Sequence, residues 1–242
     1  MRKFGLIGLP LTHSFSKKYF EEKFIAEGIG NCSYDLFELP GITDLPVLLK
    51  ASRGLSGLNV TIPYKEAVLN YVDILSPDAA VIGAVNCLKL NGDKVEGFNT
   101  DAYGFEISLL KILSVKPDQA FVLGTGGSSK AVGYVLNKLN IPFYSVSREK
   151  KDSGIAYNEI EGLMRGRNLF INTTPLGMFP AVDACPDVPY DKLSNHDVLF
   201  DLIYNPSETE FLKRGKVQDA IIKNGLEMLE LQAEKSWEIW NS

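Results

Sequence analysis

Cysteine and histidine are both scarce in this chain of 242 residues. Cys32, Cys87 and Cys185 are an odd number at wide separations, and they match neither a disulfide framework nor a zinc-ligand spacing. We therefore interpret them as free thiols in a reducing compartment. The only histidines, His13 and His196, form no ligand pattern with neighbouring cysteines or carboxylates, so no metal site is expected.

Excess positive charge and long apolar runs are also missing. The chain has 25 Lys and Arg against 30 Asp and Glu, a net charge of -5. Nucleic-acid binders carry a basic surface, so the expected partners are small molecules rather than nucleic acid. The apolar run in the first residues is too short for a signal peptide, and no apolar run of about 18 residues follows, so no membrane association is expected. The sequence predicts a cytoplasmic protein, monomeric or homodimeric.

The apolar periodicity switches repeatedly between strand-like and helix-like segments, which is typical of α/β proteins. In the first third it predicts strands at 3–8, 34–38 and 55–62, a helix that follows Ser16, short helices at 45–50 and 66–72, and a hairpin of 85–90 with 94–96 around Asn91-Gly92. A helix from Asp101 that stops before Pro117 is expected to lead into a second domain. The last helix, at about 225–240, is expected to return to the first domain.

The segment around Gly124 is the most diagnostic. A buried strand at 120–123 is followed by the turn Gly124-Thr125-Gly126-Gly127 and by an apolar-faced helix at 128–139. This is a dinucleotide-binding arrangement, because glycine lets the backbone approach a pyrophosphate that the helix N-terminus attracts. Ser129 replaces the third glycine of the usual fingerprint, and a simple tight turn is the alternative.

Further strands at 143–147, 169–172 and 198–201 extend this pattern into a Rossmann-like, doubly wound sheet. The sequence therefore predicts two α/β domains. Residues 1–101 with 225–242 are expected to form a substrate-binding catalytic domain, and residues 102–224 a dinucleotide-binding domain.

The end of the second strand of this sheet bears on the choice of cofactor. NAD enzymes place an acidic side chain there to bind the ribose 2'-hydroxyl. Here the strand ends in Ser147-Arg148-Glu149-Lys150, and Arg148 is suited to fork onto a 2'-phosphate. The sequence therefore predicts a preference for NADP over NAD. The alternative interpretation is that these residues are only a solvated run of charges at a strand end.

Three polar groups stand out in the first domain: the segment Asn59 to Lys65, Asn86 at the end of Gly-Ala-Val-Asn, and Asn99-Thr100-Asp101 after the hairpin. Taken singly, each is more often a turn former or a solvated side chain than a site residue. Ser14 has no histidine base in a recognisable context, so a hydrolase triad gains no support. The joint order of the groups is the informative feature.

In that order, the chain resembles the shikimate dehydrogenase family nearly from end to end. The family's serine, lysine, asparagine and aspartate motifs are similar to Leu11 to Ser16, Asn59 to Lys65, Gly83 to Asn86 and Asn99 to Asp101. Further matches are Gly124 to Lys130, Asn172 to Pro175, Asp201 to Pro206 and Gly225 to Gln232.

The resemblance implies an enzyme that interconverts 3-dehydroshikimate and shikimate with NADP, and it implies a set of site residues. Lys65 and Asp101 are the implied catalytic pair. Substrate binding is implied for Ser14, Ser16, Asn59, Thr61, Asn86, Tyr204 and Gln232. Cofactor binding is implied for Gly124, Thr125, Gly126, Gly127, Ser128, Ser147, Arg148, Lys150, Thr173 and Gly225.

The chain departs from the family pattern at Lys17, Thr125 and Glu227, where proline, alanine and glycine are usual. None of these changes removes a functional side chain. Two alternatives stay open: a quinate/shikimate dehydrogenase that uses either cofactor, and a non-catalytic NADP-binding sensor on the same fold. Arg148 and Ser16 favour the strict shikimate dehydrogenase over the quinate/shikimate enzyme. The retained pair of Lys65 and Asp101 favours it over the sensor.

Overall fold

The computed structural model describes residues 1–12, 14–150 and 154–242, and His13 lies outside them. The chain forms two compact units. Unit 1 comprises Met1–Thr100 and Ala233–Ser242, and unit 2 comprises Asp101–Gln232. The chain therefore passes between the units twice, inside α4 (Thr100–Leu110) and inside α8 (Leu226–Asn241). The second passage lies at Ala233, inside the last helix, whereas the predicted boundary is Gly225, just before that helix.

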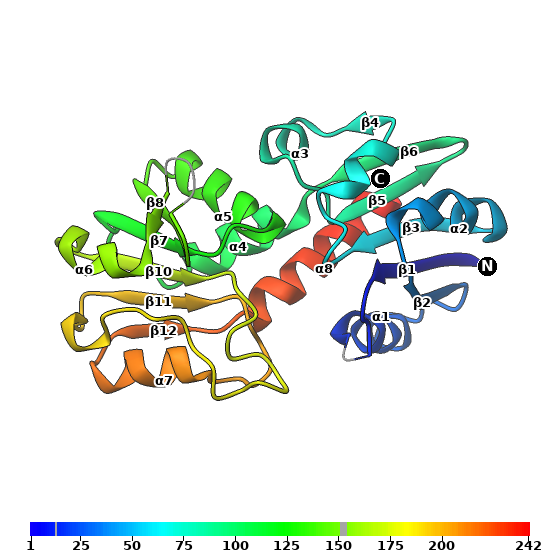
Figure 1. Ribbon diagram of the computed structural model, residues 1–242. Helices are drawn as coiled ribbons and strands as arrows, with labels where there is room; N and C mark the ends of the chain where they lie inside the picture. The colour runs from blue at the N-terminus through cyan, green and yellow to red at the C-terminus, as the bar shows by residue number, and fades with distance from the viewer. Residues whose placement is uncertain (13, 151–153) are drawn as a thin grey trace. The chain divides into compact units, whose positions relative to one another are not determined.

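Unit 1 is built on a six-stranded mixed sheet with the strand order β2-β1-β3-β5-β6-β4 (Figure 1). The strands are β1 (Arg2–Gly8), β2 (Cys32–Glu38), β3 (Leu55–Val60), β4 (Ile74–Leu75), β5 (Cys87–Asn91) and β6 (Lys94–Phe98). β1 pairs in parallel with β2 and β3, whereas β5 pairs antiparallel with β3 and β6. The β5–β6 pair is the predicted hairpin, and Gly92 takes the positive φ of 64° that its turn requires.

The two faces of the unit 1 sheet bury separate apolar clusters. Ile7 and Leu58 belong to one cluster, whereas Phe4, Tyr34 and Trp240 belong to the other. The helical elements of this unit are α1 (Phe15–Ala26), η1 (Ile42–Asp44), α2 (Leu45–Ala51), η2 (Ala67–Tyr71) and α3 (Pro77–Ile82). Alternate residues of a strand point to opposite faces, so the apolar runs of these strands supply both clusters.

Trp240 fixes the end of α8 against this sheet. Its ring stacks on Phe4 with centroids 4.7 Å apart, and its indole N–H donates to the Leu88 carbonyl at 2.9 Å. A Cβ at Gly57 would lie 2.2 Å from Trp240 Nε1, so glycine on β3 makes room for the indole. The last residues of the chain are therefore part of the core of unit 1.

Unit 2 contains a six-stranded sheet in the order β12-β11-β10-β7-β8-β9, with every pair parallel. The strands are β7 (Gln119–Leu123), β8 (Phe143–Ser147), β9 (Ile155–Ala156), β10 (Asn168–Asn172), β11 (Val198–Asp201) and β12 (Ile221–Lys223). Counted along the chain from β7, this is the 3-2-1-4-5-6 order of a Rossmann fold. The predicted α/β class and the doubly wound sheet are confirmed.

Helices cover the unit 2 sheet, whose central strands β7, β10 and β11 are buried along their whole length. α5 (Gly127–Lys138) packs on β7, and α7 (Glu210–Val217) packs on β11 and β12 (Figure 1). Phe121, Phe170 and Phe211 lie in its main apolar cluster. The shorter elements are η3 (Tyr157–Glu159), α6 (Ile160–Leu163) and η4 (Tyr190–Lys192). No helix of the described residues is both long enough and apolar enough to cross a membrane.

Several short elements differ from the predictions. The helix expected at 66–72 is the 3-10 helix η2. The first helix was expected to follow Ser16, but α1 begins at Phe15 because Ser14 is its N-cap. The unpredicted α3 starts at Pro77, where the Ser76 hydroxyl accepts from the Ala79 N–H at 3.3 Å. A cap residue followed by proline is a helix-start signal, so this element was recognisable from the sequence.

Candidate functional site

The glycine turn of unit 2 follows β7 and opens α5. Gly124 has φ of 114°, and a Cβ there would lie 2.6 Å from Thr173 Oγ1, so only glycine fits. Gly126 is the N-cap of α5, and nothing lies within 4 Å of the place where its Cβ would be. Gly127 and Ser128 form the first turn of the helix. The turn thus offers an open backbone at a helix N-terminus, which suits a pyrophosphate.

Thr173 joins this turn to the end of β10. Its N–H and its hydroxyl both donate to the Leu123 carbonyl, at 3.0 and 2.7 Å. β7 and β10 are adjacent strands whose connections leave in opposite directions along the sheet. Ligands of doubly wound sheets bind at the carboxyl ends of the strands at such a switch point. The structure therefore brings Thr173 and the glycine turn together at that edge.

The side chains at the end of β8 and just after it differ in whether they already have hydrogen-bond or ion-pair partners. Ser147 donates its hydroxyl to the Glu149 carbonyl, and the Lys150 ammonium forms an ion pair with Glu159 at 3.2 Å. The Ala156 N–H and Lys150 together hold the pKa of Glu159 below its usual range. Arg148 is exposed. Of the three side chains predicted to contact the 2'-phosphate, Arg148 is the one with no hydrogen bond or ion pair to another described residue, although its charge acts on the Tyr157 hydroxyl.

A buried carboxylate organises the ends of β10 and β11. Asp201 accepts hydrogen bonds from Asn172 Nδ2 at 3.0 Å, the Ile203 N–H at 3.0 Å and the Thr209 hydroxyl at 2.5 Å. Burial raises the pKa of Asp201 to about 6, although these hydrogen bonds oppose the shift. The network fixes the segment that leads to Tyr204.

Gly225 lies against the same segment. A Cβ at this position would be 2.0 Å from the Leu202 carbonyl oxygen, and the Gly225 N–H donates to the Ile203 carbonyl at 2.9 Å. Close backbone contact is therefore the local reason for glycine immediately before α8. The contact also fixes where α8 starts relative to β11 and Tyr204.

The serine motif of unit 1 forms the start of α1. Ser14 caps the helix, and its hydroxyl accepts from the Ser16 N–H at 3.3 Å. Both serines are half-buried. Two hydroxyls are therefore presented within the first turn of one helix, an arrangement that can bind a carboxylate through hydrogen bonds.

The lysine motif forms a turn after β3. The Tyr64 N–H donates to the Thr61 carbonyl at 2.9 Å, and the Val85 N–H donates to the Lys65 carbonyl at 2.7 Å. The second bond ties the main chain at Lys65 to the Gly83–Asn86 motif. The structure thus brings the lysine and asparagine motifs together within unit 1.

Asn59 and Asn86 are both buried, with 4% and 3% of their surfaces exposed. The Asn59 side chain contacts Tyr34, Ser236 and the Asn86 main chain. The Asn86 Oδ1 accepts from the Thr100 N–H at 2.6 Å, which fixes the residue just before Asp101. Neither Tyr34 nor Ser236 was singled out from the sequence. For Ser236 the only signal was a polar residue beside the apolar stripe of the last helix.

Asp101 and Gln232 lie in unit 2 on helices that touch. Asp101 is in the first turn of α4, and Gln232 is on α8 with its Nε2 donating to the Leu229 carbonyl at 2.8 Å. A Cβ at Gly104 would lie 2.5 Å from the Met228 carbonyl and 3.1 Å from the Gln232 N atom. The absence of a side chain at Gly104 therefore allows the two helices to pack closely.

Glu227, one of the departures from the family pattern, also joins α4 to α8. Its carboxylate forms ion pairs with Lys111 and with Lys223, the latter at 2.6 Å, and accepts from the Ser108 hydroxyl at 3.3 Å. Hydrogen bonds from Lys111 and Lys223 hold its pKa at about 2, well below the usual range. The departure adds contacts within unit 2.

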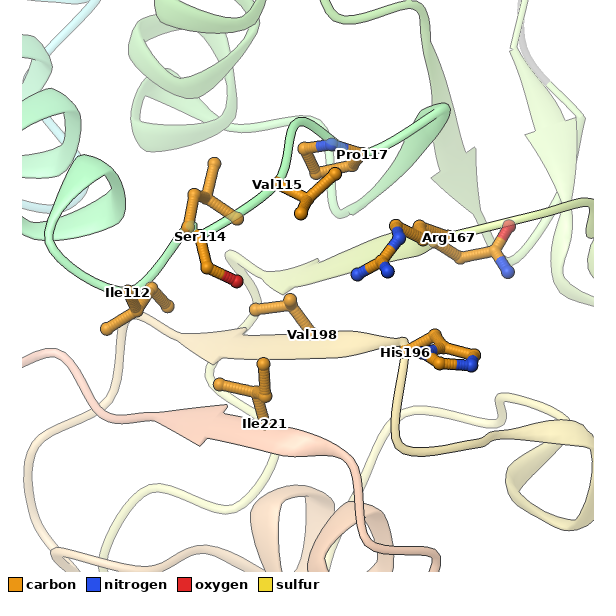
Figure 2. Close-up of a pocket in the computed structure, with 10 residues that line it drawn as sticks. Ile112, Ser114, Val115, Pro117, Arg167, His196, Val198 and Ile221 are labelled. Atoms are coloured by element: carbon orange, nitrogen blue, oxygen red, sulfur yellow. The ribbon is translucent and has the colours of Figure 1, made fainter.

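A shallow pocket in unit 2 lies at the other edge of the sheet. It is lined by the segment after α4 and by the starts of β10, β11 and β12, including Val115, Arg167, His196 and Ile221 (Figure 2). It offers about the room of one water molecule. Since ligands of this fold bind at the carboxyl ends of the strands, this pocket is not part of the candidate site.

Comparison with known proteins gives matches over both units. A family model described as the shikimate dehydrogenase substrate binding domain matches residues 6–88. The NADP(+) shikimate dehydrogenase of Clostridium beijerinckii is 41% identical over 251 aligned residues, covering 99% of this chain and 92% of that protein.

Solved structures agree. Shikimate dehydrogenase 1 from Peptoclostridium difficile is 37% identical with a TM-score of 0.85, covering 100% of this chain and 92% of that one. The shikimate 5-dehydrogenase of Thermus thermophilus, solved in complex with NADP(H) and shikimate, is 30% identical with a TM-score of 0.84, covering 99% and 93%. These matches run through unit 1 and unit 2 alike.

Proposed function

Because the chain belongs to the shikimate dehydrogenase family, we propose that it catalyses the reversible NADPH-dependent reduction of 3-dehydroshikimate to shikimate. It is an oxidoreductase that acts on a CH–OH group. The observation that carries the proposal is the identity of 41% over 99% of the chain to a protein of that name. This reaction belongs to the biosynthesis of aromatic amino acids.

The residues of unit 2 fit a dinucleotide. The open Gly126 backbone at the start of α5 suits the pyrophosphate, and exposed Arg148 suits a 2'-phosphate. Thr125 and Thr173 lie in the two turns at the same sheet edge, and Gly225 lies against the Leu202 main chain just after β11. When bound, NADPH supplies the hydride. Ser147 and Lys150 join this set only if their contacts to Glu149 and Glu159 rearrange.

The protein must manage one proton, and Lys65 is the proposed acid-base. Reduction of a ketone develops negative charge on its oxygen, so an ammonium beside that oxygen stabilises the transition state and delivers the proton. Shikimate oxidation uses the same amine as the base. Asp101 is the proposed partner that orients the lysine and binds a ring hydroxyl.

The remaining polar residues bind and orient the substrate. We assign the substrate carboxylate to Ser14, Ser16 and Tyr204, and the ring hydroxyls to Thr61, Asn86 and Gln232. Ser14 and Ser16 lie in one helical turn, which supports joint binding of a carboxylate. Contacts of this kind exist in the ground state and the transition state alike, so they lower KM more than they raise kcat.

The division of labour follows from these assignments. Of the residues assigned to the substrate, Ser14, Ser16, Thr61, Asn86 and the acid-base Lys65 lie in unit 1. Asp101, Tyr204, Gln232 and the residues assigned to the cofactor lie in unit 2. The chain functions in the cytoplasm as a monomer or a homodimer with small molecules as its partners.

One assay tests the function. Purified protein is mixed with shikimate and NADP, and reduction of the cofactor is followed by its absorbance. Parallel reactions use quinate in place of shikimate and NAD in place of NADP. We expect turnover with shikimate and NADP to exceed the other combinations. Binding of NADP without any turnover would instead support a sensor, and equal rates with quinate or NAD would support the broader enzyme.

A further inference from the structure

Polar side chains connect α1 to α8 through the interior of unit 1. The Tyr34 hydroxyl on β2 donates to Asn59 Oδ1 at 2.9 Å. Burial raises the pKa of Tyr34, and neighbouring Ser16 opposes this shift. Asn59 Nδ2 on β3 donates to Ser236 Oγ on α8, also at 2.9 Å. A residue of the serine motif is thereby linked to a residue of the lysine motif through Tyr34.

The connection continues from Ser236 to the asparagine motif. The hydroxyl oxygens of Ser236 and Thr100 lie 3.1 Å apart. Asn86 Nδ2 donates to Thr100 Oγ1 at 3.0 Å, and Asn86 Oδ1 accepts from the Thr100 N–H at 2.6 Å. We call the series Ser16, Tyr34, Asn59, Ser236, Thr100 and Asn86 the buried relay. It joins three residues for which the resemblance implies substrate binding through three for which it does not.

The relay is shielded from water and held in one arrangement. Tyr34 has 2% of its surface exposed and Ser236 has 0%. The Tyr34 ring stacks on Phe20 with centroids 4.5 Å apart, which fixes where its hydroxyl lies. Burial raises the pKa of the Cys87 thiol, which contacts Ser236, to about 12, so this neighbour stays neutral. Water cannot replace a lost partner here without entering the core.

Asn59 has no amide hydrogen left for a substrate. Its Nδ2 carries two, which face Ser236 Oγ and the Asn86 carbonyl at 2.9 and 3.4 Å, and its Oδ1 accepts from Tyr34. The Asn86 carbonyl can only accept, so it fixes the orientation of the amide. The side chain resembled a substrate contact in the sequence, but its geometry is that of a link between other residues.

We propose that Tyr34 and Ser236 are positioning residues for the substrate, with Asn59 as the link through which they hold Ser16 and Asn86 in place. The proposal rests on the proposed function, because it takes Ser16 and Asn86 to bind shikimate. It predicts that single hydroxyls buried inside unit 1 control shikimate affinity without touching shikimate. The affinity for NADP, which is assigned to unit 2, should not depend on them.

Tyr34→Phe tests this with the least structural change, because it removes only the hydroxyl. We expect the dissociation constant for shikimate, measured by calorimetry, and the KM to rise about tenfold, the loss of one well-placed hydrogen bond. We expect kcat to change by less than about twofold and the NADP dissociation constant to stay unchanged. The matched control is Tyr190→Phe, which removes a hydroxyl that donates to the Pro186 carbonyl in unit 2 at 2.8 Å.

Ser236→Ala tests the relay from its other side, and the double variant tests whether the two residues act together. We expect the double variant to lose less shikimate affinity than the product of the two single losses, because either change interrupts the same series. Thermal melting accompanies each measurement. If Ser236→Ala does not fold, the positioning role is decided by Tyr34→Phe against its Tyr190→Phe control.

The outcomes separate the two proposals. Wild-type protein that does not reduce NADP with shikimate overturns the proposed function and this inference with it. An active wild type with unchanged shikimate affinity in Tyr34→Phe overturns the positioning role alone. Equal losses of shikimate and NADP affinity also overturn it, because they would show general loosening of the fold.

Discussion

The two units prepare their binding residues in opposite ways. In unit 1 Asn59 and Asn86 are buried and held by side-chain hydrogen bonds, and Ser14 and Ser16 are half-buried. In unit 2 the glycine turn offers backbone at an exposed helix start, and Arg148 extends from a strand end. A rigid ring with several hydroxyls needs side chains held at fixed positions, whereas a pyrophosphate needs only N–H groups and room. Changes in the two units should therefore have separable effects.

Lys65→Ala is expected to give the largest difference between an effect on turnover and an effect on ligand binding. Loss of a general acid-base should lower kcat by about a hundredfold to ten-thousandfold, while the dissociation constants for shikimate and NADP change much less. Calorimetry and single-turnover hydride transfer measure the two quantities. Lys89→Ala is the control, since Lys89 lies in the same unit and its ammonium donates hydrogen bonds only to Ser242 among the described residues. Near wild-type transfer in Lys65→Ala would exclude Lys65 as the acid-base.

Asp201→Asn should change how the stability of unit 2 depends on pH. The native state raises the pKa of Asp201 from 3.8 to about 6, so the native state holds this proton more tightly than the unfolded chain does. Stability from this group is therefore fully present below about pH 4 and is lost as pH rises through 6. The loss is about 3 kcal/mol at about 1.4 kcal/mol per pKa unit. Asparagine, which does not ionise, should remove this part of the pH dependence.

Urea unfolding between pH 4 and pH 7 measures the effect, provided that the units are followed separately. The only tryptophans, Trp237 and Trp240, lie in unit 1, so their fluorescence reports that unit, while far-UV circular dichroism reports both. We expect Asp201→Asn to change the dichroism transition and leave the fluorescence transition in place. A pH dependence identical to that of the wild type would contradict the assigned pKa.

Arg148→Ala should reduce the preference for NADP over NAD by about tenfold to a hundredfold, because the charge-assisted contact to the 2'-phosphate is absent with NAD. The measurement is kcat/KM for both cofactors. Shikimate affinity should not change. Arg165→Ala removes an arginine of the same unit, outside the cofactor residues, as a control. An unchanged ratio would remove Arg148 from cofactor recognition.

The smallest effect is expected from Glu227→Gln. The depressed pKa of Glu227 means that its ion pairs stabilise unit 2 above about pH 4.5, and that this contribution is lost as pH falls through about 2. Partly exposed pairs contribute about 1 kcal/mol or less. We expect a lower urea midpoint at pH 7 and a smaller difference at pH 3. Glu230→Gln, three positions along the same helix, should behave as the wild type at both pH values.

Much of this molecule could be predicted from the sequence. The strand at 198–201 occurs as predicted, because a parallel strand buried on both faces is a continuous apolar run. The strand at 143–147 also occurs as predicted, although it is only partly buried and contains two serines. The glycine turn was recognisable because a strand precedes it and a helix follows it. Shorter elements such as β4 and β9, each of two residues, leave no periodicity to detect.

The contacts of the site residues were less predictable. The sequence indicated that Asn59 and Lys150 are polar residues at strand ends, but not that Asn59 is enclosed by Tyr34 and Ser236 or that Lys150 pairs with Glu159. Such contacts join residues from different elements, and their geometry depends on packing between those elements. Motif order reveals which residues gather, whereas the hydrogen bonds reveal which of them remain available to a ligand.

The two passages of the chain between the units determine the order in which the units can be completed during synthesis. Unit 2 is one continuous stretch, Asp101–Gln232, whereas unit 1 needs Ala233–Ser242, which is synthesised after unit 2. Domains usually fold in the order of synthesis. Here the N-terminal unit must wait, with its sheet uncovered where Trp240 will pack and the Asn59 amide without Ser236, until after unit 2 is complete. The proposed catalytic lysine is therefore synthesised early, but unit 1 around it is completed only after unit 2 has been synthesised.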